Sequence, residues 1–174
     1  MARLHSHYEA AFEDYLRSRG VPYVPVNEAR KVIFSGNKVK SFDFLIYPGG
    51  AQQWIVDIKG RKFPYIGSNG SKRYWENWVL REDLEGLADW QEVFGDEFEA
   101  QFIFAYQLQG PPDRWPAGRP HCFNHNYYAF LAVARQDYER HCQVRSDKWE
   151  TVSVPTRVFR EIARPVESLT LWDA

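Results

Sequence analysis

The chain has 174 residues, of which 44% are hydrophobic, enough for one globular domain with a sizeable core. We therefore expect a single domain over residues 1–174. No apolar run approaches the roughly 20 residues that a membrane-spanning helix needs, and the N-terminal residues lack the apolar stretch of a signal peptide. These absences predict a cytoplasmic protein with no membrane partner.

The formal net charge is only −1, but the charged residues are unevenly distributed. Residues 1–81 hold 13 Lys or Arg against 7 Asp or Glu, whereas residues 82–174 hold 9 against 16. A basic first half would suit binding to a phosphate backbone. A solvated surface with a chance asymmetry explains the same distribution equally well, so both interpretations stay open.

The residues that most often ligate zinc are sparse. Cys122 and Cys142 show no metal-ligand spacing, which favours isolated thiols over a zinc site or a disulfide. His121 and His125 are four residues apart, but they lie among Pro, Cys, Phe and Asn. That context predicts a loop rather than a metal-binding helix.

The first predicted element is a helix over residues 4–20, ended by Gly20. One helical face carries the apolar residues Leu4, Tyr8, Ala11, Phe12, Tyr15 and Leu16. Glu9 falls at the edge of this face, and Glu13 lies about 40° further toward solvent. Glu9 can therefore point into the domain, or it can be a solvated acid paired with Arg3 or Arg17.

Extended segments follow the helix. The segments over residues 21–26 and 31–36 are short. Residues 40–48 and 53–60 form two strands joined by a Gly-Gly pair that supplies the positive φ of a tight hairpin. Asp57 and Lys59 are two residues apart and share one strand face, with Ile58 on the other. Asp43 enters from the partner strand, so that two carboxylates can meet and repel by a few kcal/mol. A bound Mg²⁺ is the simplest way to relieve that repulsion.

Simpler interpretations of the same residues remain. Asp57 and Lys59 can form a surface salt bridge on an edge strand. Asp43 can be a turn residue at a strand end. The order in which Glu9, Asp43, Asp57 and Lys59 occur together makes each of these alternatives weaker.

Residues 60–78 are irregular, basic and aromatic, and they are predicted to form a loop beside these charged strands. The candidate phosphate-binding residues in this segment are Arg61, Lys62, Lys72 and Arg73. The candidate base-stacking residues are Tyr74, Trp75 and Trp78. Packing of these three rings beneath the loop is an equal alternative.

The rest of the chain alternates between helices and strands. A helix over 81–94 carries Leu84, Leu87 and Trp90 on one face and stops at Gly95. Gln107 and Gln109 read as strand-end polar residues rather than substrate contacts. The other predicted elements are a buried strand over 99–108, a loop over 109–121, a strand over 126–134, a helix or turn over 135–144, and a short strand and closing helix within 151–169 that stops near Pro165.

A helical Glu9 before a glycine, Asp43 on a hairpin strand, and an Asp-x-Lys unit formed by Asp57 and Lys59 on the next strand together resemble the PD-(D/E)XK phosphodiesterase superfamily. Within it, the pattern is most similar to the archaeal Holliday junction resolvase type. The resemblance implies an α/β fold with a restriction endonuclease-like αβββαβ core, in which helices flank a mixed sheet. It covers residues 1–62 in motif and extends to about 133 in element order.

This sequence departs from the pattern at two positions. Residue 42, just before Asp43, is Phe rather than Pro, and the second acid, Asp57, is Asp rather than Glu. Both variants occur within the superfamily pattern. The shorter side chain of Asp57 requires the metal closer to its strand, which bears on the choice of metal.

The resemblance also implies roles for individual residues. Asp43, Asp57, the carbonyl of Ile58 and Glu9 would hold Mg²⁺, for which Mn²⁺ can substitute. Lys59 would position the attacking water or neutralise charge in the transition state. The implied function is a metal-dependent nuclease that hydrolyses structured or single-stranded DNA. Resolvase-like nucleases are homodimers, so the resemblance also implies a second copy of the chain as a partner. The alternatives are a noncatalytic nucleic-acid-binding or scaffold protein on the same fold, and an RNA-processing nuclease.

Overall fold

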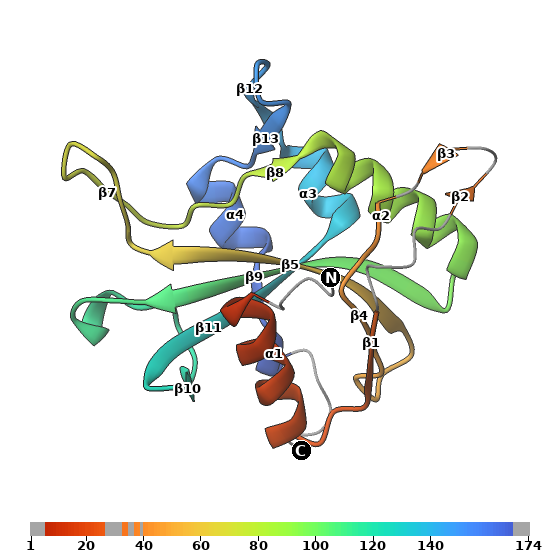
Figure 1. Cartoon of the computed structure of the whole chain (residues 1–174), viewed down its shortest axis with the longest axis horizontal. Coiled ribbons are helices and arrows are strands. Elements are labelled where there is room, and N and C mark those ends of the chain that lie inside the picture. The colour runs from red at the N-terminus through yellow and green to blue at the C-terminus, as the bar shows by residue number, and fades with distance from the viewer. Residues whose placement is uncertain (1–5, 27–32, 35–36, 39, 169–174) are drawn as a thin grey trace.

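The computed structural model describes residues 6–26, 33–34, 37–38 and 40–168. Its centre is a 7-stranded mixed sheet with the strand order β1-β4-β5-β9-β11-β10, to which β14 is added beside β11 (Figure 1). Strands β5 and β9 pair in parallel, and the other neighbours in this sheet pair antiparallel. The strands are β1 Tyr23–Pro25, β4 Phe44–Ile46, β5 Gln53–Phe63, β9 Phe98–Leu108, β10 His121–Phe123, β11 Asn126–Ala134 and β14 Arg164–Pro165.

Helices cover both faces of the sheet (Figure 1). Alternating side chains along β5 and β9 build two separate cores, because successive residues of a strand point to opposite faces. Ile58 and Ile103 pack on the α1 side, whereas Phe102 and Phe104 pack on the opposite side. The helices are α1 His7–Ser18 on the first face, and α2 Arg81–Phe94, α3 Arg135–His141 and α4 Thr156–Ile162 on the second.

Smaller sheets decorate this layered core. Two short hairpins project from the body of the protein in Figure 1, one formed by β6 and β7 and one by β12 and β13. The short strands are β2 Ile33–Phe34, β3 Asn37–Lys38, β6 Tyr65–Ile66, β7 Lys72–Arg73, β8 Val79–Leu80, β12 Gln143–Ser146 and β13 Thr151–Ser153, and the 3₁₀ turns are η1 Pro112–Arg114 and η2 Val166–Ser168.

The elements with the clearest sequence patterns are confirmed. Helix α1 is followed by Gly20 at φ +66°, and α2 is followed by Gly95 at φ +78°. Leu84, Leu87 and Trp90 are buried on α2 as expected. Strand β9 occupies the predicted buried strand, and β11 occupies the strand predicted over 126–134. The mixed α/β architecture implied by the resemblance is therefore present.

Several local predictions are wrong. The link between β4 and β5 is a loop over residues 47–52, and within its Gly-Gly pair only Gly49 has a positive φ, at +85°. The segment predicted to be irregular after Lys59 instead extends β5 to Phe63 and then forms the β6–β7 hairpin. His121 lies on β10 rather than in a loop, because it pairs with β11 and its Nε2 contacts Asp14 Oδ2 at 2.7 Å.

Other expectations are met only in part. The early strand expected over 31–36 appears as Ile33–Phe34, which pairs with β3 rather than with the central sheet. Leu4 and Arg3 lie outside the described residues. Cys122 and Cys142 are both free thiols. Across the part of the chain that is described, the helices are too short or too polar to cross a membrane.

Candidate active site

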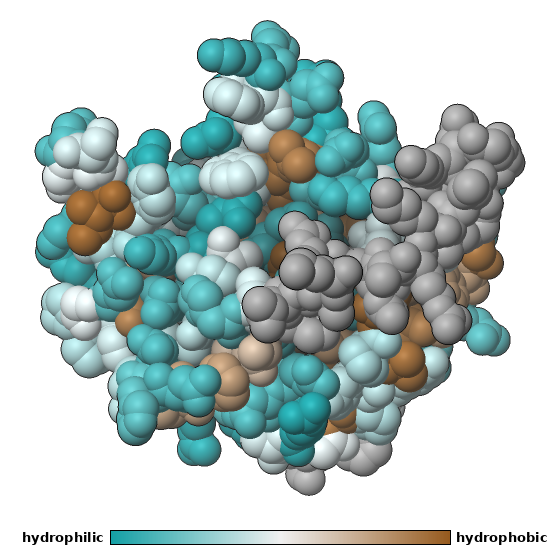
Figure 2. Space-filling model, in the orientation of Figure 1, coloured by the Kyte–Doolittle hydropathy of each residue, from teal (hydrophilic) through white to brown (hydrophobic). Residues whose placement is uncertain are grey.

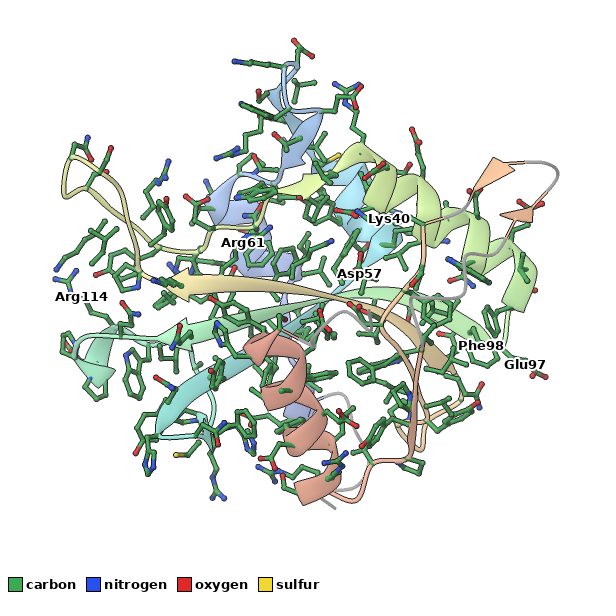
Figure 3. All side chains as sticks on the ribbon, viewed as in Figure 1. Lys40, Asp57, Arg61, Glu97, Phe98 and Arg114 are labelled. Atoms are coloured by element: carbon green, nitrogen blue, oxygen red, sulfur yellow. The ribbon has the colours of Figure 1, made fainter. Side chains whose placement is uncertain are left out.

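Asp57 and Lys59 lie on β5 between β4 and β9, so they occupy an interior strand of the sheet rather than an edge. Lys59 Nζ is 3.1 Å from Asp57 Oδ2, as expected for two side chains on one strand face. Figure 3 shows Asp57 on the α2 side of the strand. The side chains of Lys59 and Asp57 are only 14% and 12% exposed, which removes the premise of a surface salt bridge.

Asp43 immediately precedes β4 and is buried. Its Oδ2 accepts a hydrogen bond from the backbone N–H of Ile58 at 2.6 Å. Its carboxyl group also shares a hydrogen bond with that of Asp57. Asp43 continues the ladder rather than a turn, because its N–H donates to the carbonyl of Val56 at 2.9 Å. The two acids therefore meet across neighbouring strands.

The two acids resist carrying full negative charge. Burial raises the pKa of Asp43 well above its usual range, and the charges of Asp57 and Glu9 add to this rise. Burial also raises the pKa of Asp57, although the ammonium group of Lys59 opposes that rise. A divalent cation bound by the two carboxylates would offset this cost.

Glu9 lies near the N-terminus of α1, where its backbone N–H donates to Ser6 Oγ at 3.3 Å. Its side chain is half-buried, and its charge is close enough to Asp43 to raise the pKa of that acid. Arg17, one of the partners considered for Glu9, pairs with Glu13 at 2.9 Å. Helix α1 therefore brings a third carboxylate toward the Asp43–Asp57 pair.

Asp83, on the first turn of α2, was not predicted to belong to the site. Its side chain is 2% exposed, and its Oδ2 is 2.9 Å from Lys59 Nζ. Asp83 also contacts Lys40 Nζ and accepts the N–H of Leu80 at 2.9 Å. A sequence signal existed, because Asp83 shares the centre of the apolar helix face with Leu87 and Trp90 at i, i+4 and i+7.

The ion pairs decide the protonation of Lys59 and Asp83. Burial alone would lower the pKa of Lys59, but Asp57 and Asp83 outweigh it and raise the pKa above its ordinary value. Burial alone would raise the pKa of Asp83, but Lys59 and Lys40 outweigh it and lower that pKa. Lys59 is therefore held as a cation between two carboxylates.

The donor set fits a hard divalent cation such as Mg²⁺. The ligands available are two carboxylates and the backbone carbonyl of Ile58, and Mg²⁺ prefers oxygen ligands and keeps several waters. Three buried carboxylates, Asp43, Asp57 and Asp83, face only two ammonium groups, those of Lys59 and Lys40, so ionisation of all three acids leaves one negative charge that a cation would balance. Within the described residues, no three His, Cys, Asp or Glu side chains come close enough together to form a metal site.

The predicted nucleic-acid-binding residues separate into two groups. Arg61, Lys62, Arg73 and Trp78 line a pocket of about 580 Å³, and Lys72 is exposed on the same β6–β7 hairpin. Tyr74 and Trp75 instead pack against Phe63, with ring centroids 5.2 and 5.1 Å away. These two rings line a different hollow and match the packing alternative.

The two strand-end glutamines also differ. Gln107 Nε2 donates to Asn126 Oδ1 at 3.2 Å, which fits a structural role. Gln109, two residues later, lines the 580 Å³ pocket. One of the two is therefore available to contact a ligand.

A mixed sheet with α1 on one face, an Asp-x-Lys strand at its centre and a helical crossover to a parallel strand defines the restriction endonuclease-like fold. The structure is similar to that of Archaeoglobus fulgidus Hjc, a Holliday junction resolvase from an archaeal hyperthermophile, with a TM-score of 0.52. The match covers 94% of this chain and 97% of that chain at 13% sequence identity, which shows the fold. No protein-family model and no curated protein matches the sequence.

Proposed function

We propose that the protein is a metal-dependent nuclease that hydrolyses phosphodiester bonds in DNA. The observation that carries the proposal is the buried pair Asp43 and Asp57 beside a cationic Lys59. Two acids with raised pKa values on adjacent strands destabilise the folded chain, so their presence indicates a role in binding or catalysis. A nuclease needs this combination, because a metal ion held by the two acids and the ammonium group of Lys59 can both stabilise the negative charge of a phosphate.

The residues divide the work. Asp43, Asp57 and the carbonyl of Ile58 would hold Mg²⁺ or Mn²⁺, with Glu9 acting through water. The bound ion supplies an activated water and neutralises charge on the phosphate. Lys59 stays protonated because its pKa is raised, so it acts as a cation on the transition state and not as the general base.

The fold supports the same proposal. The similar structure is that of Hjc, a Holliday junction resolvase. We extend from that protein to this one only the reaction class, a nuclease that acts on structured DNA. A single-stranded substrate is the alternative within our own proposal. A homodimer that cuts two strands is part of the same proposal.

Cleavage of labelled single strands, duplexes, flaps and four-way junctions with Mg²⁺ or Mn²⁺ tests the function. The parent chain is compared with Lys59→Ala and with Arg157→Ala, which removes a 91% exposed arginine of α4 that does not line the pocket. We expect Lys59→Ala to abolish cleavage and Arg157→Ala to keep it. Calorimetry completes the test, because Asp57→Asn should lose divalent binding whereas Lys59→Ala should retain it.

Three outcomes would contradict the proposal. Tight Mg²⁺ binding by Asp57→Asn would show that the metal site is wrongly placed. DNA binding without cleavage by the parent chain would indicate the noncatalytic protein. Cleavage of RNA and not of DNA would indicate the RNA-processing nuclease.

A further inference from the structure

A second feature adjoins the site. Beyond Lys59, strand β5 continues through Arg61 and Lys62, which line the 580 Å³ pocket. Tyr8, the residue before Glu9 on α1, lines the pocket too. Tyr8 lies against Gly60, where an added Cβ would stand 2.1 Å from the Tyr8 ring. The helix and the strand that carry the site therefore also form one wall of this pocket.

Arg61 is a partly buried cation with no carboxylate of the described residues within ion-pair distance. Its guanidinium donates to the carbonyls of Gly60, at 2.7 Å, and Trp78, and its Nε has no hydrogen-bond partner. Burial accordingly lowers the pKa of Arg61. A buried charge without a counter-ion is costly, and an anion in the pocket would remove that cost.

The other walls add positive charge and exposed rings. Arg73 and Arg145 line the pocket, and only Arg73 is offset there, by Glu76 at 3.0 Å. The guanidinium carbon of Arg145 lies 5.4 Å from the ring centroid of Trp78. Tyr65 is 43% exposed on the β6–β7 hairpin, and the guanidinium carbon of Arg73 lies 4.9 Å from its ring centroid. Excess cations beside an exposed aromatic ring match a nucleotide, whose phosphate pairs with Arg or Lys while its base stacks.

The surface around the pocket is mostly polar. Figure 2 shows hydrophilic and neutral colours between the β6–β7 hairpin at the left and the β12 hairpin at the top. One hydrophobic spot lies on the first hairpin, which carries the 53% exposed Ile66. A polar rim with one apolar contact suits a charged ligand with a flat apolar ring better than it suits a protein partner.

We propose that this pocket binds one unpaired nucleotide of the DNA strand that is cut at the Asp43–Asp57 site. A volume of about 580 Å³ lies in the range of small-ligand sites, which suits one nucleotide and not a duplex. A base that remains paired in a duplex is covered on both faces, so it cannot stack on Tyr65. The proposal rests on the proposed nuclease function, and it assigns flaps, overhangs or single strands as the substrate.

Binding without metal separates this proposal from catalysis. We would measure the anisotropy of a labelled blunt duplex, and of the same duplex with a short thymidine overhang, against the full chain in EDTA. Tyr65→Ala should weaken binding of the overhang about tenfold. Arg145→Ala should weaken it about fivefold. Both should leave blunt-duplex binding within about twofold.

Matched controls test whether the effect belongs to the pocket. Tyr127 is 45% exposed and Arg157 carries a 91% exposed side chain, and neither lines the pocket. Tyr127→Ala and Arg157→Ala should bind the overhang as the parent chain does. Free thymidine monophosphate distinguishes a strand from a free nucleotide, and it should compete only at far higher concentration than the overhang.

The outcomes are distinct. If Tyr65→Ala and Arg145→Ala bind the overhang as tightly as the parent, the pocket assignment is overturned even when Lys59-dependent cleavage is observed. If the monophosphate binds as tightly as the overhang, the pocket serves a free nucleotide and the assignment also fails. If the overhang preference depends on Tyr65 but no DNA is cut, the pocket stands and the nuclease proposal fails.

Discussion

Two groups of buried acids lie on either side of Lys59, and they are stabilised to different degrees. Asp83 receives two lysines and a backbone N–H, and its pKa is lowered. Asp43 and Asp57 share a hydrogen bond, one lysine and the N–H of Ile58, and both of their pKa values are raised. The same residue type at the same depth thus meets opposite electrostatic surroundings.

The difference separates structure from function. An acid whose partners compensate its charge holds elements together, and Asp83 joins α2 to β5 and to Lys40. Acids whose charge is not compensated destabilise the chain until a bound ligand or metal ion compensates it, which is typical of ligand sites. We therefore regard Asp83 as a positioning residue for Lys59, and Asp43 and Asp57 as the residues that await a cation.

The largest expected effect concerns catalysis. Asp57→Asn should lower the rate of Mg²⁺-dependent DNA cleavage by about 10³-fold, because it removes a ligand for the charge-stabilising cation. Asp83→Asn should lower it only about tenfold, because Lys59 keeps Asp57 as a partner. Single-turnover cleavage measures both. Equal losses would end the distinction between the two groups.

The next effect concerns stability. Asp83→Ala should lower the free energy of unfolding by about 3 kcal/mol, because it breaks a buried pair and leaves the Leu80 N–H unmatched. Urea denaturation of the metal-free chain measures this loss. Asp137→Ala, at a 46% exposed acid 3.7 Å from Arg140, is the matched control and should change stability by about 0.5 kcal/mol or less. A loss no larger than the control would show that Asp83 does not hold α2 to β5.

The pH dependence of stability should have opposite signs for the two groups. Because both pKa values are raised, the Asp43–Asp57 pair binds protons more tightly in the folded chain than in the unfolded chain, where the acids titrate near pH 4. The free energy of unfolding of the metal-free chain should therefore fall as the pH rises from about 4 through the raised pKa values. Asp83 stabilises the fold above its unfolded pKa, and this contribution is lost as the pH falls through its lowered pKa.

Asp43→Asn isolates the first contribution, since the amide oxygen can still accept the Ile58 N–H. This variant should be more stable than the parent at pH 8 in EDTA, and the advantage should shrink at pH 5. Each unit by which the pKa is raised corresponds to about 1.4 kcal/mol. Urea unfolding at both pH values measures the difference. If the difference in unfolding free energy between the variant and the parent is the same at pH 5 and pH 8, the raised pKa of Asp43 is contradicted.

The smallest effect concerns the outer lysine. Lys40 has a 39% exposed side chain, so solvent screens its ion pair with Asp83. Lys40→Ala should lower the free energy of unfolding by about 1 kcal/mol or less and leave cleavage within about twofold. Thermal unfolding and the cleavage assay measure these changes. A loss of cleavage comparable to that of Lys59→Ala would place Lys40 in the catalytic group.

Local periodicity explains what the sequence could predict. The 3.6-residue pattern of α1 and α2 and the apolar runs of β9 and β11 are encoded within each segment. The period of two residues likewise places Asp57 and Lys59 on one face, and chain order brings Asp43 to the neighbouring strand. Most of the candidate site could therefore be assembled from short-range rules and the resemblance.

The rest depends on tertiary packing. Arg145 reaches the pocket from β12. No local pattern connects it to Trp78, because α2 and β9 lie between the two residues in the chain. Tyr74 and Trp75 are aromatic like Trp78, but the path of the chain after the β6–β7 hairpin turns their rings toward the core. The length of the β4–β5 loop escaped prediction because a Gly-Gly pair fits both a tight turn and a longer loop.

Strand β5 fixes the distance between the site and the pocket. It carries Lys59 at the site and Arg61 at the pocket, two residues or about 7 Å apart along one strand that pairs with β9 from Gln53 to Phe63. A DNA strand whose unpaired nucleotide is bound in the pocket would present a phosphodiester bond to Lys59 at a fixed distance from that nucleotide. The cut position would then be counted from the point where pairing ends, whatever the base sequence.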